Sequence, residues 1–168
     1  MQKNKKHPVI AAVMWIFFLA AVAVVVYLSF QDGEQAKTVG ERFISYLARQ
    51  RYPGRKATTQ ELLELTYEVR QLGRVCAFFV IGILGTAAIH ISFGRNNWLV
   101  KTGVTASLLV AIAYFTERLK IYIPTRHYSY EEMMVSIISV MMGFILVSII
   151  TLTFQAFKGF FRLVTAVH

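Results

Sequence analysis

Eight polar residues stand at or near the ends of long apolar stretches, where their chemistry is conspicuous. They are Ser29, Gln31, Arg70, Arg74, Glu117, Lys120, Arg126 and Glu132. Arg70 and Arg74 are four residues apart, so a helix presents both on one face. Ionisable groups at membrane depth tend to face a bundle interior or water and to pair. We therefore expect Glu117 and Glu132 to hold some of the three arginines, leaving a cation to bind an anionic headgroup, pyrophosphate or carboxylate.

The segments that must position these residues are hydrophobic. The 168-residue chain is 56% hydrophobic and 16% charged, whereas soluble domains carry about 25% charged residues. A bilayer-spanning helix needs about 20 apolar residues, and four stretches qualify, at about residues 8–30, 75–93, 98–115 and 133–157. They are too long and continuous for barrel strands. The sequence predicts one all-α domain, a polytopic membrane protein with four transmembrane helices, and argues against a cytosolic enzyme.

Four spans place all eight polar residues on the same side of the membrane. Lys3, Lys5 and Lys6 directly precede the first span, which usually dominates topology. This favours cytoplasmic termini and an extracytoplasmic cluster, although a count of Lys and Arg alone favours the opposite orientation. A bacterial plasma membrane is the simplest setting. The net charge of +9 fits topology and anionic lipid better than nucleic acid.

The first loop, about residues 31–74, predicts a pair of amphipathic helices. The apolar stripe of the first helix consists of Val39, Phe43, Tyr46 and Leu47, and that of the second of Leu62, Leu65, Val69 and Leu72. A turn at 51–55 separates them. Thr58 and Glu61 have the spacing of a capping box, and the second helix is expected to continue into the second span. We expect the pair to lie on the membrane surface or over the mouth of the bundle.

Known catalytic and cofactor patterns are missing from the sequence. The single cysteine, Cys76, excludes an intramolecular disulfide framework, and no zinc signature, phosphate-binding glycine loop or nucleophile elbow occurs. His127 is a lone loop histidine, and His90 lies toward the opposite membrane face. We expect no metal and no cofactor, and the two carboxylates alone give little support for an enzyme.

Small residues within the predicted spans indicate close packing of the helices. They are Gly82, Gly85, Thr86, Gly103 and Ser107.

Three motifs in order resemble the VanZ-like family of membrane proteins. They are Tyr-Leu-Ser29-Phe-Gln31-Asp-Gly-Glu, Arg70-Gln-Leu-Gly-Arg74-Val75-Cys-Ala77-Phe78, and Thr116-Glu117-Arg-Leu-Lys120-Ile-Tyr-Ile-Pro124-Thr125-Arg126. Glu132 falls where the family has Asp, and Ser136 where it has Asn. The chain departs from the family pattern at four positions and each change makes the site more positive: Arg74 for His, Ala77 for Glu, Thr116 for Asp and Lys120 for Gln.

The resemblance implies a cell-envelope role, in particular glycopeptide resistance of the teicoplanin type, without naming a reaction. Its partners would be membrane lipids, through an anionic headgroup or a lipid-linked cell-wall precursor. Two alternatives stay open. One is a membrane enzyme or lipid-handling protein acting on a phosphorylated lipid, and the other is a membrane subunit that needs a partner chain.

Overall fold

The structure is a computed structural model that describes residues 8–30, 43–55, 57–93, 98–122 and 128–166, and this part of the chain is helical with short turns. The main elements are α1 (Pro8–Phe30), α3 (Thr59–Ser92), α4 (Trp98–Arg118), the 3-10 helix η1 (Leu119–Tyr122) and α5 (Tyr130–Ala166). A further short helix covers residues 43–51.

Four of these helices are long and apolar enough to cross a membrane, which confirms the predicted all-α architecture. At 1.5 Å per residue, the 23 residues of α1 reach about 35 Å, enough for a hydrocarbon core of about 30 Å. The second span is continuous with the helix before it, as expected, in the 34 residues of α3. The helices are longer than two of the predicted spans. The third span continues past 115 to Arg118 and then into η1, and the fourth helix covers residues 130–166 rather than 133–157.

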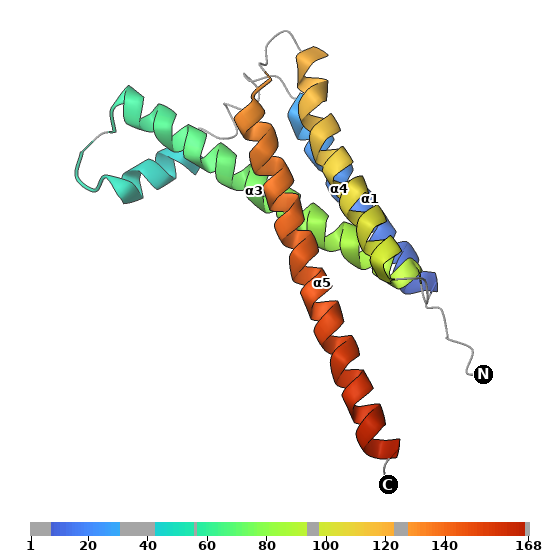
Figure 1. Ribbon diagram of the computed structural model, residues 1–168. Coiled ribbons are helices and arrows are strands. Elements are labelled where there is room, and N and C mark those ends of the chain that lie inside the picture. Colours follow the sequence, from blue (N-terminus) through green and yellow to red (C-terminus); the bar gives the residue numbers. More distant parts are fainter. Residues whose placement is uncertain (1–7, 31–42, 56, 94–97, 123–127, 167–168) are drawn as a thin grey trace.

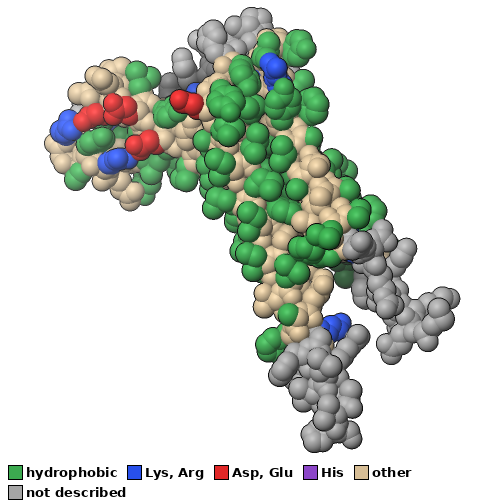
Figure 2. Space-filling model, in the orientation of Figure 1, with side chains coloured by type: hydrophobic (Ala, Val, Ile, Leu, Met, Phe, Trp, Pro, Cys, Tyr) green, Lys and Arg blue, Asp and Glu red, His purple; other side chains and the backbone are tan. Residues whose placement is uncertain are grey.

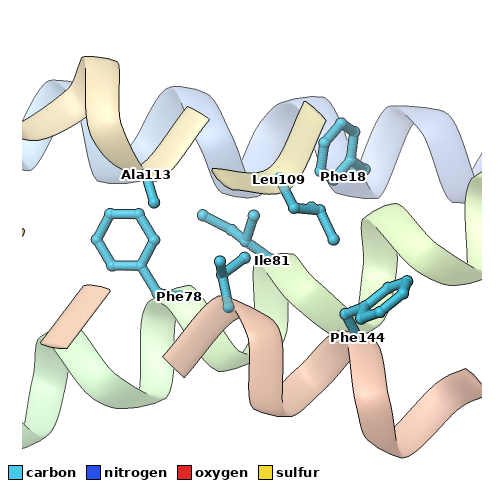
Figure 3. Packing of buried hydrophobic residues seen from close by; sticks show 7 residues of the cluster. Phe18, Phe78, Ile81, Leu109, Ala113 and Phe144 are labelled. Atoms are coloured by element: carbon cyan, nitrogen blue, oxygen red, sulfur yellow. The ribbon is translucent and has the colours of Figure 1, made fainter. Parts of the chain in front are cut away.

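α3 is the central element of the bundle. It packs against α1, α4 and α5, and α4 packs in addition against α5 and α1. Figure 1 shows α3 crossing the long α5 obliquely, with α1 and α4 running in similar directions. The hydrophobic core gathers at this crossing, and Figure 3 shows Ile81 of α3 between side chains from the other helices. The members of the core cluster are Phe18, Phe78, Ile81, Leu109, Ala113, Val140 and Phe144.

Two glycines let α3 and α5 approach until their backbones touch. A Cβ atom added to Gly82 would lie closer than 3.0 Å to the carbonyl oxygen of Val140, and one added to Gly143 would meet the backbone of α3 equally closely. Small residues allow such approach in membranes, where packing rather than hydrophobicity drives helix association. The packing role expected for Gly82 is confirmed.

The packing role expected for two other small residues is wrong. Gly103 has no atom within 4 Å of an added Cβ, and Ser107 is exposed. Both lie on the outer surface of α4, where a side chain would meet lipid. Gly85, by contrast, packs against Phe18 and Leu109 as expected.

Residues 43–55 together with 57–73 of α3 form a projecting segment, which we call the arm. Residues 43–51 fold back on α3, bringing Ala48 and Leu65 into buried positions. The turn between them contains Gly54, whose φ of +90° suits glycine because it has no Cβ. The backbone N–H of Thr58 donates to Glu61 at 2.8 Å, so the capping interaction expected at this helix start is present.

The described part of the arm goes against one of the two predicted positions, over the mouth of the bundle, and leaves the other, on the membrane surface, as a prediction. This part extends to one side of the bundle instead of covering the mouth (Figure 1). The two apolar stripes are also only partly covered, because Phe43, Tyr46 and Leu72 remain exposed. Val39 lies outside the described residues. Figure 2 shows acidic and basic side chains gathered on the arm, while the long face of the bundle in view is mainly apolar.

An exposed ion pair ties the two parts of the arm together. Arg51 Nη1 donates to Glu68 Oε2 at 2.7 Å. This hydrogen bond, with the negative charge of Glu68, raises the pKa of Arg51 above its already high ordinary value. Arg51 is therefore a permanent cation on the surface of the arm.

Candidate functional site

Three long helices and the 3-10 helix η1 bring four charged side chains together at one end of the bundle. Arg74 comes from the middle of α3, Glu117 from the last turn of α4, Lys120 from η1 and Glu132 from the first turn of α5. We call these four residues the ionic network. They are distant in sequence, with Arg74 and Glu132 separated by 58 positions. The oblique packing of α3 on α5 and α4 therefore creates the site.

Glu117 and Lys120 form the inner pair of the network. Lys120 Nζ donates to Glu117 Oε2 at 2.5 Å. The side chain of Lys120 is only 5% exposed and that of Glu117 only 1%. Glu117 is in the last turn of α4 and Lys120 is in the 3-10 turn that follows, three residues later and on the same side of the chain. Both residues lie beyond 115, the predicted end of the third span. An isolated ionised carboxylate at this depth would be very unfavourable, so the lysine is the counterion that permits it.

Arg74 and Glu132 form the outer pair. Arg74 Nη2 donates to Glu132 Oε2 at 2.6 Å, and the two side chains are 11% and 17% exposed. Lys120 Nζ also lies 3.4 Å from Glu132 Oε2, and Arg74 Nε lies 3.7 Å from Glu117 Oε1. Each cation is thus within 4 Å of both carboxylates. The pairing of Arg74 with both glutamates confirms this part of the expected geometry.

The ionic network has two positive and two negative groups and is formally neutral. Removing charges from water is costly, and in a buried pair the attraction between partners offsets that cost only with good geometry and further hydrogen bonds. Here Ser136 Oγ lies 3.4 Å from Glu117 Oε1, and Arg74 Nη1 donates to Gln71 Oε1 at 3.1 Å. The site is therefore a nearly closed polar network next to an apolar core.

The remaining sequence-predicted site residues do not join the ionic network. Arg70 is exposed and has no ion pair within the described chain, although it lies one turn before Arg74 on the same helix face. Ser29 is half-buried in the last turn of α1 and forms no hydrogen bond with the network in the described structure. Gln31 and Arg126 lie outside the described residues, as does His127.

Two polar residues of the site were not among the predicted ones. Gln71 orients the guanidinium of Arg74 from one turn earlier in α3, and Ser136 approaches Glu117 from the second turn of α5. The sequence feature that could have indicated Gln71 is its spacing of three residues from Arg74. Ser136 lies four residues after Glu132 and donates to its backbone carbonyl at 3.0 Å.

This arrangement can neutralise, orient or exchange an anion, but it lacks the parts of a metal centre. The described residues contain no group of three or more His, Cys, Asp or Glu side chains placed to hold a metal ion. Cys76 is a free, exposed cysteine on α3. Away from the network, Trp15 Nε1 of α1 donates to Ser92 Oγ of α3 at 2.8 Å.

The fold and site together define a multi-pass α-helical membrane protein with buried charges at one end of its bundle. Comparisons with protein-family models, with curated proteins and with solved structures find no match to this chain. The resemblance to the VanZ-like family therefore stays a prediction from the sequence motifs.

Proposed function

We propose that this protein acts in the bacterial cell envelope, the role that its resemblance to the VanZ-like family implies, and that it does so by recognising an anionic group at the ionic network. The network would protect the cell against glycopeptide antibiotics of the teicoplanin type. It would do so by engaging an anionic headgroup or a lipid-linked cell-wall precursor at the membrane. In this proposal the protein lies in the plasma membrane with both termini in the cytoplasm and the network on the extracytoplasmic side.

The observation that carries the proposal is the meeting of four charges, two buried and two partly buried, from α3, α4, η1 and α5 at one end of the bundle. Charged residues at membrane depth are costly, and where they occur they usually mark a functional path or site. Guanidinium and ammonium groups are the natural partners of phosphate and carboxylate. Arg74 and Lys120 supply both kinds of cation within reach of the same carboxylate oxygen, Glu132 Oε2.

An antibiotic susceptibility assay tests the proposal. The full-length protein is expressed in a sensitive Gram-positive host, and inhibitory concentrations are compared for teicoplanin and vancomycin. We expect protection against teicoplanin that Arg74→Gln and Glu117→Gln abolish. Glu131→Gln is the matched control, because Glu131 is an exposed neighbour of Glu132 without an ion pair in the described structure.

Membrane abundance of each variant is measured alongside, so that loss of the protein is not mistaken for loss of the site. Equal susceptibility of cells with and without the wild-type protein, at confirmed abundance in the membrane, would contradict the proposed resistance role. Protection that survives both network substitutions would contradict the proposed site.

A further inference from the structure

The cations of the ionic network are already occupied by internal carboxylates. The guanidinium of Arg74 donates to Gln71 and Glu132 and lies near Glu117. Lys120 Nζ donates to both glutamates. An external anion therefore cannot simply add to the network, because each cation already has its counterion. It has to replace one of the two carboxylates.

Of the two carboxylates, Glu132 is the one placed to leave. Its side chain is the most exposed of the network at 17%, against 1% for Glu117. Glu117 is held by a 2.5 Å bond from Lys120 and approached by Arg74 and Ser136. Glu132 has one strong bond, from Arg74, and a longer one of 3.4 Å from Lys120.

The place that Glu132 occupies has the chemistry of a phosphate site. Its carboxylate lies between a guanidinium and an ammonium group, 2.6 Å and 3.4 Å from the two donor nitrogens. Glu132 also lies in the first turn of α5, where the helix dipole favours an anion. A phosphate monoester, with several charged oxygens, would satisfy Arg74 and Lys120 together.

An exposed arginine stands outside this position. Arg70 precedes Arg74 by one helical turn on the same face of α3 and makes no ion pair within the described chain. Its guanidinium is thus a cation near Arg74 that no carboxylate of the described residues pairs with. From outside to inside, the cations follow the order Arg70, Arg74, Lys120, with side chains that become steadily less exposed.

We infer that Glu132 is an internal competitor that an anionic phosphate monoester displaces from Arg74 and Lys120 when it binds. This inference rests on the proposed recognition of an anion at the network and specifies its ligand class and its regulation. Glu132 keeps the empty site neutral and lowers its affinity, so weakly charged groups are refused. The phosphate is carried either on a lipid or free in solution, since both present the same oxygens.

A titration of the purified full-length protein tests the displacement. Binding of dioctanoyl phosphatidic acid and, separately, of inorganic phosphate is measured by calorimetry in a zwitterionic detergent, with dioctanoyl phosphatidylcholine as the lipid control. We expect Glu132→Gln to bind at least one of the two phosphate probes about tenfold more tightly than wild type, since it removes a charge-assisted competitor. Glu131→Gln, which changes the neighbouring charge equally, should leave the affinity unchanged, and Arg74→Gln should abolish binding.

The two arms identify the source of the phosphate. A gain confined to phosphatidic acid assigns a lipid headgroup, and a gain with inorganic phosphate assigns the free anion. Unchanged or weakened binding in Glu132→Gln, or an equal gain in Glu131→Gln, would overturn the displacement while leaving anion recognition intact. Absence of phosphate binding in the wild type and in Glu132→Gln would overturn both the displacement and the proposed recognition.

A second variant keeps the test decisive if Glu132→Gln does not fold. Glu132→Asp retains the charge but shortens the side chain by one methylene, so its bond to Arg74 weakens while the network stays neutral. We expect a smaller gain in affinity of the same sign. If neither variant can be purified folded, Glu132 is required for the structure and a displaceable role is excluded.

Discussion

Substitution of Gly143 by alanine should separate the two helices on which the ionic network depends. The added methyl group would lie closer than 3.0 Å to the carbonyl oxygen of Phe79 and the backbone nitrogen of Ile83. Non-bonded carbon contacts settle at about 3.5–4.0 Å, so α3 and α5 must move apart by about 1 Å. The clashing atoms belong to backbone, and no side chain can rotate away to relieve them.

The size of the effect follows from the packing at this crossing. Inserting a methylene-sized group into a closely packed interior typically costs about 1–3 kcal/mol. The matched control is Gly103→Ala in α4, where an added Cβ meets no atom within 4 Å. That substitution should stabilise, because alanine exceeds glycine in helix propensity by about 1 kcal/mol. Both glycines lie inside helices, so the propensity gain applies to both variants and their difference is the packing cost alone, about 1–3 kcal/mol.

The assay is equilibrium unfolding of the purified full-length protein by sodium dodecyl sulfate in mixed micelles, followed by the fluorescence of Trp15 and Trp98. We expect the midpoint to fall for Gly143→Ala and to hold or rise for Gly103→Ala. Equal midpoints for the two variants would refute the close approach of α3 and α5. A second readout is available because Arg74 and Glu132 bridge the same two helices. Separation of the helices weakens this bridge, so Glu132→Gln should destabilise the Gly143→Ala protein less than it destabilises wild type.

Three smaller predictions use the same unfolding assay. Glu117→Ala should destabilise the protein by about 3–5 kcal/mol because it leaves Lys120 buried without its principal counterion. The loss should shrink when Lys120→Met is added, and an equal loss in the double variant would argue against the pairing. Trp15→Phe should destabilise by about 1 kcal/mol, the typical net value of one hydrogen bond, here the bond to Ser92; an unchanged midpoint would mean that this bond does not hold α1 on α3. Arg51→Ala should leave the midpoint almost unchanged because its ion pair is exposed and screened by solvent, and a clear fall in the midpoint would contradict this reading of the pair.

The spanning segments were predictable from the sequence because apolar length is a direct physical requirement of a bilayer. The start of α3 was predictable for a similar reason, since Glu61 satisfies a backbone N–H that the helix leaves free. The ends of the spanning helices were harder to predict. Helix α4 continues to Arg118 and η1 through Glu117 and Lys120, whose charges end the apolar stretch in the sequence but are buried as an ion pair in the structure.

The buried face of each span could not be read from the sequence. In a soluble helix an apolar stripe marks the core, but lipid is as apolar as a protein interior and removes that contrast. Gly82 and Gly103 consequently looked alike, although one touches a neighbouring backbone and the other faces outward. For the same reason, the sequence could not show which of Arg70 and Arg74 joins the ionic network. Both lie on one face of α3, and only the depth at which α3 crosses the bundle decides which of them is buried.

The order of the ionic network along the chain has a consequence for biosynthesis. Arg74 is synthesised before either of its carboxylate partners, and Glu132 follows it by 58 residues. At about 5–20 residues per second, that interval lasts about 3–12 s. During it the guanidinium has no complete set of partners and stays at the edge of the bilayer, where water solvates it. Insertion of α5 therefore completes the network, and the depth of α3 is settled only when the last helix arrives.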